Sequence, residues 1–379
     1  MDVDLSAWQV SEKDFPESGT PADKLAFCVR YAVLAPSTYN TQPWHFVVND
    51  DSVSVLADRR HGLAVIDPDD RELSMSCAAA LYLLRLALRN FGYEETTTLL
   101  PDPKQPGLYA RVKIGGKIQL TADQQAELDK DRLLFKGVTK RHSNRQQFTD
   151  KPVPDEILRS LQNAVSGDGA DGCWLHICNE DERALLVRFI AEGDHIQSGD
   201  KQFRRELASW TDPRRTLSRD GLAGLGLSYE DVVGKLTPTI ARRFAVDGNR
   251  AASDQELADG SPVLAILGSA KGGVLQRLHV GQAWMRILLE AQALGLSVSF
   301  LNQPCEVPAL RLSLHDELAQ QGRAHIILRM GFGGTPKFTS RRPIEDVLTI
   351  TGRTKSSSVS SSASPKSGFF KKLGGILKK

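Results

Sequence analysis

The chain has 379 residues, which is long enough for two domains or for one large body with a sizeable core. Its composition, 41% hydrophobic and 25% charged, is that of a globular protein, and no stretch approaches the roughly 18 uninterrupted apolar residues of a membrane span. Seven of the 48 basic residues and none of the 46 acidic ones lie in 353–379, so the rest of the chain has 41 basic against 46 acidic groups and a net charge of −5. A mildly acidic body argues against general binding of nucleic acid.

The chain begins with an acidic segment that has no apolar signal region, so we expect a cytoplasmic protein. Its five cysteines, an odd number, contain no Cys-x-x-Cys pair, and its eight histidines contain no His-Glu-x-x-His pattern. We therefore expect neither a disulfide framework nor a bound metal.

A polar turn at residues 35–44, with the sequence APSTYNTQPW, separates two apolar segments. Before it, apolar residues recur at helical spacing over 25–33, and after it the run 44–48 has strand-like residues. Pro36 restricts the backbone and Pro43 forbids a helix, so the turn is predicted to be rigid. Composition alone leaves two interpretations, a binding loop or an ordinary connection between a helix and a strand.

Two long amphipathic segments, 70–92 and 274–295, indicate an internal duplication. Each has small residues midway, is predicted to be helical and ends on a glycine suited to a helix C-terminus. They align with Gly92 on Gly295, and strand-like sequence follows both.

A second alignment sets 157–178 over 27–48, with Trp174 on Trp44. The helix and strand patterns coincide, but small residues replace the polar ones of the first loop. The positions of Pro36, Ser37, Asn40 and Gln42 correspond to Ser166, Gly167, Ala170 and Gly172. The second loop thus lies between the same helix and strand patterns as the first, but it lacks the polar residues of the first loop.

The rest of the sequence contains a charged helical linker and a long insert at 195–250 that is rich in glycine and arginine, and we expect the insert to be a mobile excursion rather than part of the core. We interpret the insert either as a lid over a ligand or as a surface arm with other partners. The predicted organisation is an N-terminal extension (1–22), a first half (23–119), a linker (120–136), a second half (137–352) and a tail (353–379).

The tail consists of a serine-rich linker followed by a basic peptide at 367–379. Its five large apolar residues fall on one helical face with lysines off that face, although Gly374 and Gly375 each weaken a helix by about 1 kcal/mol. The peptide is interpreted either as a segment that binds a membrane surface or a partner, or as a disordered basic tail.

Three motifs of this chain resemble the FMN-dependent nitroreductase family. The string Pro36-Ser37-x-x-Asn40-x-Gln42-Pro43-Trp44 is similar to the family's flavin-contacting loop. The motif Arg141-x-Ser143-x-Arg145 resembles the start of a family protomer, and Ser340-Arg341-Arg342-Pro343 resembles its C-terminal phosphate-binding stretch. The resemblance covers roughly residues 20–350.

Members of that family are homodimers in which one protomer supplies the arginine motifs of a flavin site and the other supplies the loop. Here the first half has the loop but no Arg-x-Ser-x-Arg, whereas the second half has both arginine elements and a replaced loop. The resemblance therefore implies a fused dimer of the duplicated, Acg-like branch with one FMN per chain. The implied fold is α+β, with a nitroreductase-like mixed sheet and long central helices packed as a monomeric, single-chain pseudo-dimer.

The resemblance also implies which residues bind the cofactor. Arginine guanidinium groups such as those of Arg141 and Arg341 suit a phosphate, because each charge-assisted hydrogen bond contributes about 1.5–3 kcal/mol. Arg145 would lie near the N1/C2=O edge of the flavin, and the segment 299–305 beside its ring. The implied cofactor-binding set is Pro36, Ser37, Thr38, Asn40, Gln42, Arg141, His142, Ser143, Arg145, Asn302, Arg341 and Arg342. No catalytic side chain is implied.

The implied activity is reduction of a small nitroaromatic or quinone-like molecule by NADH or NADPH. As a lid, the insert at 195–250 would cover the flavin face on which substrates stack. A flavin-sequestering or storage protein with little turnover is therefore the alternative.

Overall fold

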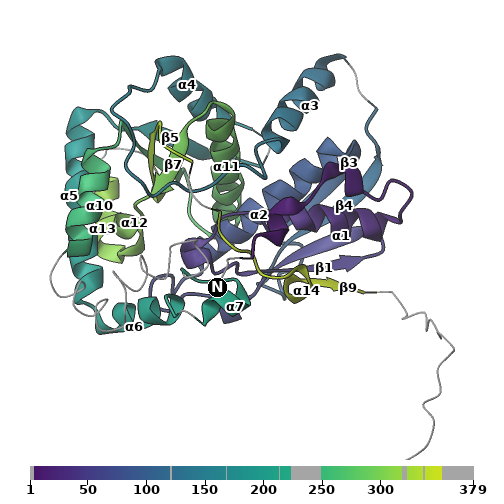
Figure 1. Cartoon of the computed structure of the whole chain (residues 1–379), viewed down its shortest axis with the longest axis horizontal. Coiled ribbons are helices and arrows are strands. Elements are labelled where there is room, and N and C mark those ends of the chain that lie inside the picture. Colours follow the sequence, from purple (N-terminus) through teal and green to yellow (C-terminus); the bar gives the residue numbers. More distant parts are fainter. Residues whose placement is uncertain are drawn as a thin grey trace, which may run out of the picture.

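The structure is a computed structural model that describes residues 4–119, 122–167, 169–212, 214–222, 249–317, 322–335 and 338–351. Two β-sheets lie on either side of two long helices, α2 (Arg71–Asn90) and α11 (Val274–Ala293), which pack against each other in the middle (Figure 1). The predicted tail, as well as residues 223–248 of the insert, lies outside the described residues.

The first sheet has five strands in the order β3-β4-β2-β1-β9. Its strands are β1 (Trp44–Asn49), β2 (Ser52–Ala57), β3 (Tyr93–Leu99), β4 (Leu108–Lys117) and β9 (Leu348–Ile350). Neighbouring strands are antiparallel except for β1 and β9, which are parallel. The sheet is therefore mixed.

The second sheet has four antiparallel strands in the order β5-β6-β8-β7. Its strands are β5 (Cys173–Ile177), β6 (Val263–Ser269), β7 (Ser297–Phe300) and β8 (Arg323–Gly331). Every residue of β6 is buried, as expected for its continuous apolar run.

The two halves repeat one topology. Read from β7, the second sheet runs β7-β8-β6-β5, which is the order β3-β4-β2-β1 of the first sheet. Helix α2 connects β2 to β3, and α11 connects β6 to β7. The two helices begin at positions that are as far apart in the sequence as Gly92 and Gly295, and they also end at positions with the same separation. The predicted internal duplication and α+β class are confirmed.

Short-range sequence signals explain where several helices begin and end. Helix α1 (Pro21–Ala32) begins with a capping box between Thr20 and Asp23, and proline occupies its first position. Helices α2 and α11 are followed by Gly92 and Gly295, whose φ values of 77° and 74° are readily adopted only by glycine.

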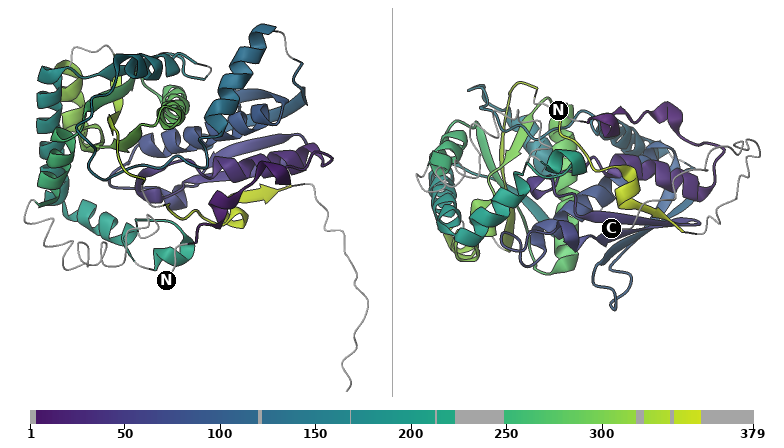
Figure 2. Two further views of the ribbon diagram at one scale, coloured as in Figure 1. Left: turned by 45° about the horizontal axis from the view of Figure 1, so that its top comes forward. Right: turned by 60° about the horizontal axis from the view of Figure 1, so that its bottom comes forward.

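The other described helices are α3 (Ala122–Phe135), α4 (Asp155–Ala164), α5 (Glu180–Gly199), α6 (Lys201–Trp210), α7 (Arg215–Ser218), α10 (Asn249–Asp259), α12 (Gln303–Glu306), α13 (Pro308–Glu317) and α14 (Ile344–Val347). Among them, α5, α10, α12 and α13 pack together beside the second sheet, whereas α3 and α4 pack against the central helices (Figures 1 and 2). Short 3-10 helices occupy Ser6–Gln9, Glu12–Asp14, Thr38–Asn40 and Arg59–His61. Over the described ranges, no helix is both long enough and apolar enough to pass through a bilayer.

Part of the insert differs from the mobile excursion that its composition suggested. Residues 195–222 are largely helical, and Phe203 and Trp210 are buried against Leu63 and Ile66 of the first half. The teal segment in Figure 2 accordingly leaves the second half and reaches the purple first half. Apolar side chains at helical spacing, rather than the flanking glycines, determine this conformation.

Helices α2 and α11 approach each other closely at Gly281. A Cβ on Gly281 would overlap the Met75 carbonyl oxygen and the Ala78 side chain. The small residues noted midway along both segments therefore allow the two backbones to pack in direct contact.

We expect Gly281→Ala to lower the free energy of unfolding by about 1–3 kcal/mol, because an added methyl in a packed interface forces the helices apart. Gly199→Ala is the matched control, because no atom lies within 4 Å of the position of its Cβ. Urea denaturation of both variants checks this, and equal stabilities would contradict the close approach.

Candidate functional site

The polar loop between α1 and β1 is held in a strained conformation. Tyr39, Asn40 and Gln42 all have φ values between 51° and 56°, a region that costs a non-glycine residue roughly 1 kcal/mol or more. Ser37 Oγ accepts a hydrogen bond from the backbone N–H of Gln42 at 2.9 Å, and Gln42 Nε2 donates to the Asn40 carbonyl at 3.2 Å. Asn40 and Gln42 are buried, so the loop is rigid, as its prolines suggested.

Two arginines from the second half converge on the end of α1. Arg141 Nη2 and Arg341 Nη2 both donate to the carbonyl oxygen of Leu34, at 3.4 and 3.2 Å. Arg141 and Arg341 are each only 4% exposed. Within the described part of the chain, neither guanidinium forms an ion pair, and Arg141 Nη1 and Arg341 Nε have no hydrogen-bond partner.

The electrostatics of this arginine pair are unfavourable in the protein alone. Burial lowers the pKa of Arg141 to about 10. Burial and then the charge of Arg141 lower the pKa of Arg341 to about 9. A pair of buried cations with unused N–H donors is the environment expected around a bound anion, which would remove both penalties.

The loop of the first half meets the C-terminal segment directly at this pair. Arg341 Nη1 donates to Asn40 Oδ1 at 3.2 Å and to the Ser340 carbonyl at 3.0 Å. Asn40 Nδ2 donates back to the Ser340 carbonyl at 3.3 Å. Two predicted site residues 301 positions apart are therefore brought into contact.

Arg342 supports the loop rather than joining the arginine pair. Its backbone N–H donates to Gln42 Oε1 at 2.8 Å, and its Nη1 donates to the Gln42 carbonyl at 3.0 Å. Its Nη2 lies 3.7 Å from Asp58 Oδ2, so its charge is balanced inside the protein. Arg342 therefore uses its hydrogen-bond donors and its charge on protein groups, and its role is to orient Gln42.

The N-terminal extension covers the arginine pair, which the sequence analysis did not foresee. The Trp8 ring lies 4.9 Å from Arg341 Cζ, and Trp8 Nε1 donates to the Thr339 carbonyl at 2.7 Å. His142 packs against Trp8 and Phe338, with ring centroids 4.6 and 4.0 Å apart. Burial, together with the two arginines, lowers the pKa of His142 to about 3, so its imidazole is neutral at ordinary pH.

The Arg-x-Ser-x-Arg segment lies against the edge of the second sheet. Ser143 forms a parallel bridge with Val298, and the Asn144 N–H donates to the Val298 carbonyl at 2.9 Å. The buried Arg329 donates to the Asn144 and Gln146 carbonyls, both at 2.9 Å, and so fixes the backbone on either side of Arg145. Arg145 itself is exposed.

Glu72, in the first turn of α2, joins two predicted parts of the site. Its carboxylate accepts hydrogen bonds from Thr38 Oγ1 and from Asn302 Nδ2, the latter at 3.3 Å. Asn302 Oδ1 in turn accepts from the Ile327 N–H at 3.0 Å. The only sequence signal for Glu72 was an acidic residue at a helix N-terminus, which is also typical of ordinary helices.

A buried carboxyl beside Glu72 has unusual acid–base properties. Asp67 accepts hydrogen bonds from the Arg71 and Leu73 backbone N–H groups at 2.7 and 2.8 Å, which anchors the start of α2. Burial, and then the charge of Glu72, raise the pKa of Asp67 to about 7. Asp67, Glu72 and Thr38 line a small cavity with room for about one water molecule.

The described part of the insert reaches the same loop. Gln42 Nε2 donates to the Arg219 carbonyl at 2.9 Å, just after α7. The Glu206 carboxylate on α6 accepts from the Val65 and Ile66 N–H groups, both at 3.0 Å. Helices α6 and α7 are thus attached to the segment that follows β2.

Protein side chains fill the corresponding region of the second half. A Cβ on Gly167, which aligns with Ser37, would overlap the guanidinium of Arg286. Gln282 Oε1 lies 2.8 Å from the Cβ position of Gly169 and accepts a hydrogen bond from Arg85 at 2.8 Å. The second loop therefore packs against side chains of α2 and α11.

The fold and the site define a member of the nitroreductase family. Residues 138–333 match the model of that family. The chain is also 30% identical, over 84% of its own length and 86% of the relative's, to the protein named "Putative NAD(P)H nitroreductase Rv3131" from Mycobacterium tuberculosis strain H37Rv. It is 24% identical to Acg of the same strain, whose name carries the same description, over 89% of this chain and 99% of Acg. The resemblance stated from the motifs is confirmed.

Two solved structures of nitroreductases match at lower identity. The FMN and NADPH-dependent nitroreductase NfnB from Sphigopyxis sp. strain HMH is 17% identical, with a TM-score of 0.41 over 58% of this chain and 99% of that chain. The FMN-bound nitroreductase from Desulfitobacterium hafniense is 16% identical, with a TM-score of 0.36 over 57% of this chain and 97% of that chain.

The raised pKa of Asp67 predicts a pH dependence of stability. The folded state holds a proton on Asp67 between pH 4 and pH 7 that the unfolded chain has released, so this carboxyl makes stability fall as the pH rises through that window. Relative to Asp67→Asn, the wild type should lose up to about 1.4 kcal/mol of unfolding free energy per pH unit. Urea denaturation of both proteins at pH 5 and pH 7 measures the difference, and parallel profiles would contradict a raised pKa.

Proposed function

We propose that this protein is an FMN-dependent oxidoreductase that uses NADH or NADPH to reduce a small molecule. The observation that carries the proposal is the buried pair of Arg141 and Arg341, which has unused N–H donors and no acidic partner among the described residues. The family assignment and the names of the relatives support the same class of reaction.

The residues at the site fit the chemistry of FMN. Arg141 and Arg341 supply two positive charges for the phosphate dianion, and each charge-assisted bond contributes roughly 1.5–3 kcal/mol. Asn40 and Ser37 present polar side chains on a rigid loop beside that pair. Bound FMN would supply the ring that accepts a hydride and passes electrons to the substrate.

The remaining residues of the predicted set have supporting or peripheral positions. Thr38 and Asn302 are oriented by Glu72, and Gln42 is oriented by Arg342, so these contacts fix the loop and the segment after β7. Ser143 and Arg145 lie on the segment beside β7, where the resemblance places the ribityl chain and the polar edge of the ring.

We further propose one FMN per chain. The first loop has the arginine pair beside it, whereas Arg286 and Gln282 occupy the space next to the second loop. A single chain then provides both sides of its one site, which is consistent with a monomeric pseudo-dimer.

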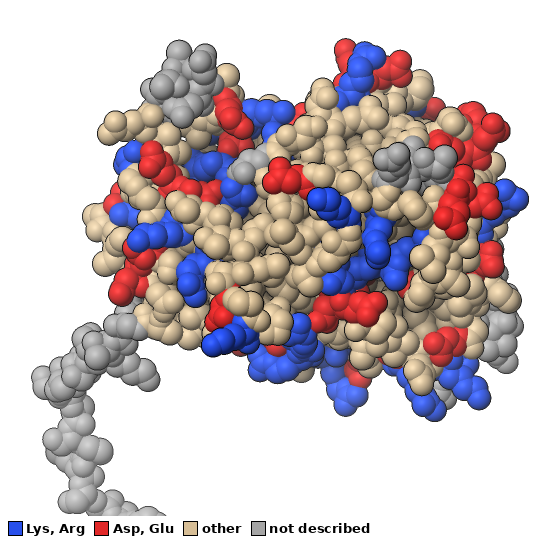
Figure 3. Space-filling model, turned by 180° about the vertical axis from the view of Figure 1, so that it is seen from behind, with Lys and Arg blue, Asp and Glu red and all other residues tan. Residues whose placement is uncertain are grey.

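For substrates and partners, the proposal is a small nitroaromatic or quinone-like molecule and no nucleic acid. Figure 3 shows acidic and basic side chains interspersed over one face of the molecule, rather than one continuous basic surface. The basic peptide at 367–379 lies outside the described residues, so its binding to a membrane or a partner stays a prediction.

A second candidate function is flavin sequestration, and the position of α6 and α7 favours it. These helices are attached to the cofactor loop through Gln42 and to the segment after β2 through Glu206. A covered cofactor would exchange slowly and react slowly with a hydride donor.

Replacing both arginines with methionine should weaken FMN binding by a factor on the order of 100 or more, because two charge-assisted hydrogen bonds are lost. The same double variant, Arg141→Met with Arg341→Met, should not destabilise the FMN-free protein, because it removes two mutually repelling buried charges. FMN titration by fluorescence and thermal unfolding of the apoprotein measure the two effects. Arg159→Met with Arg188→Met, at two exposed positions on α4 and α5, is the charge-matched control. Undiminished binding in the double variant would mean that the phosphate lies elsewhere.

A variant in which α6 packs less tightly distinguishes the proposed reductase function from flavin sequestration. Trp210→Ala removes a buried side chain that packs with Leu63 and Ile66, so it should speed reduction of bound FMN by NADPH if α6 limits access. Leu217→Ala, on exposed α7, is the control and should leave the rate unchanged. Stopped-flow absorbance under anaerobic conditions gives the rate. A native rate in Trp210→Ala, with FMN still bound, would count against sequestration.

A further inference from the structure

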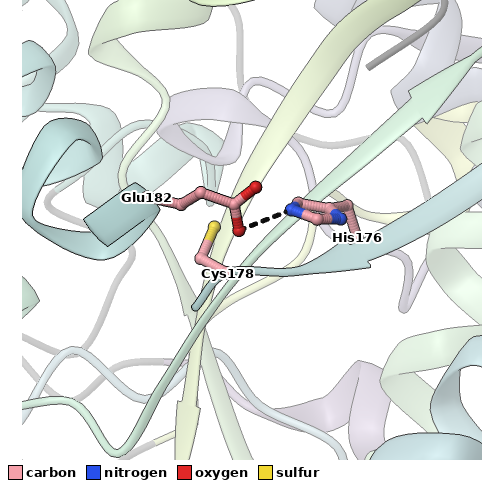
Figure 4. A group of neighbouring side chains, drawn as sticks. All are labelled: His176, Cys178 and Glu182. Carbon is pink, nitrogen blue, oxygen red and sulfur yellow. Dashed lines mark hydrogen bonds and ion pairs between the residues drawn. The ribbon is translucent and has the colours of Figure 1, made fainter. Parts of the chain in front are cut away.

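A cluster of three different metal-ligating side chains lies where β5 leads into α5, far from the cofactor loop along the chain. His176, Cys178 and Glu182 each offer one ligand atom, and these atoms lie within 4.8 Å of one another. Figure 4 shows the imidazole of His176 in β5 and the thiol of Cys178, just after the strand, close to the carboxylate of Glu182 on α5. No other group of this kind occurs among the residues that the structure describes.

We propose that His176, Cys178 and Glu182 form a binding site for a zinc ion. Imidazole nitrogen, thiolate sulfur and carboxylate oxygen are the three ligand types that Zn²⁺ prefers. With a solvent molecule as the fourth ligand, the site would have the three-protein-ligand, open form.

The geometry requires only side-chain adjustments. Zinc–ligand bonds of about 2.0–2.3 Å place tetrahedral ligand atoms roughly 3.3–3.8 Å apart. His176 Nε2 and Glu182 Oε2 are now 2.8 Å apart, and the widest separation in the cluster is 4.8 Å or less. Shifts of about half an ångström to 1 Å would therefore suffice, within the range of small side-chain rotations.

Rigid elements hold the ligands in place. His176 belongs to β5, where it pairs with Ile266, and the Cys178 N–H donates to the Leu264 carbonyl at 3.0 Å. Glu182 forms the capping box of α5 with Asn179: its carboxylate accepts from the Asn179 N–H at 2.9 Å, and its own N–H donates to Asn179 Oδ1 at 3.0 Å. These hydrogen bonds orient the carboxylate before any ion binds.

The surroundings favour entry of a cation. The His176 and Glu182 side chains are 22% and 20% exposed, so an ion can enter from solvent and a water molecule can complete the shell. Glu180 and Asp181 add negative charge in the first turn of α5. The nearby Arg183 donates through Nη2 to the Ala258 and Asp259 carbonyls, which directs its charge toward α10.

This site is independent of the proposed FMN site. Helix α5 has 20 residues and is thus about 30 Å long, and its far end leads into α6. A bound ion would fix the start of this helix, and thereby stabilise the element from which the insert emerges. The pattern His-x-Cys-x-x-x-Glu matches none of the short metal motifs sought in the sequence, because a strand end and a helix start bring it together.

The test uses full-length protein without a histidine tag, stripped with a chelator and titrated with Co²⁺ as the spectroscopic probe. We expect one Co²⁺ per chain, a thiolate-to-cobalt band in the near ultraviolet, and displacement of Co²⁺ by Zn²⁺. Cys178→Ser should abolish the band. Cys173→Ser, which removes another partly buried thiol from β5, should retain it.

Glu182→Gln provides a second test that preserves folding, because its amide oxygen can still accept the Asn179 N–H. It should weaken Zn²⁺ binding by about tenfold or more. Thermal unfolding and circular dichroism of each variant verify the fold, and His176→Asn replaces Cys178→Ser if the latter does not fold. The proposal is overturned if no thiolate band appears, if the band survives in Cys178→Ser, or if Glu182→Gln binds Zn²⁺ as tightly as the wild type.

Discussion

The direct packing of α2 on α11 positions the two sheets relative to each other. Because Gly281 has no side chain, the backbone of α11 touches the Met75 carbonyl and Ala78 of α2. Both helices are buried along most of their length, and each sheet packs on the outer side of the pair. A change in the spacing of the two helices would therefore move the cofactor loop of one half relative to the arginines of the other.

The arginine pair illustrates how a binding site can be prepared at the expense of stability. Both guanidinium groups are buried, with the Trp8 ring beside Arg341 and the Leu34 carbonyl accepting from both, although the protein supplies no carboxylate to neutralise them among its described residues. A dianion that enters such a site meets donors that are already oriented and already desolvated, so little of the binding energy is spent on rearrangement. Strained backbone angles in the adjacent loop contribute to the same rigidity.

Much of the fold was predictable because its signals are local. Helical periodicity and a terminal glycine identified both α2 and α11, and the repeat of those signals revealed the duplication. The loop at 35–44 was identified by its prolines and by its place between a helix and a strand. Such features depend on residues a few positions apart, which a sequence displays directly.

The features that were missed depend on contacts between distant segments. Nothing near Trp8 in the sequence indicates that its ring covers Arg341, and nothing near Glu72 indicates that it bridges Thr38 and Asn302. The insert was misjudged in part because its glycines and arginines suggested mobility, whereas the burial of Phe203 and Trp210 depends on apolar residues of the other half. The His176 cluster likewise exists only where β5 and α5 meet.

The parallel pairing of β9 with β1 has a consequence for the synthesis of the chain. Phe46 in β1 pairs with Leu348 in β9, and until β9 arrives β1 is the open edge of the first sheet. At a translation rate of about 5–20 residues per second, roughly 15–60 s separate the emergence of the two strands from the ribosome. During that interval Asn40 also lacks Arg341, so the nascent first half can neither complete its sheet nor form the contact between its loop and the C-terminal segment.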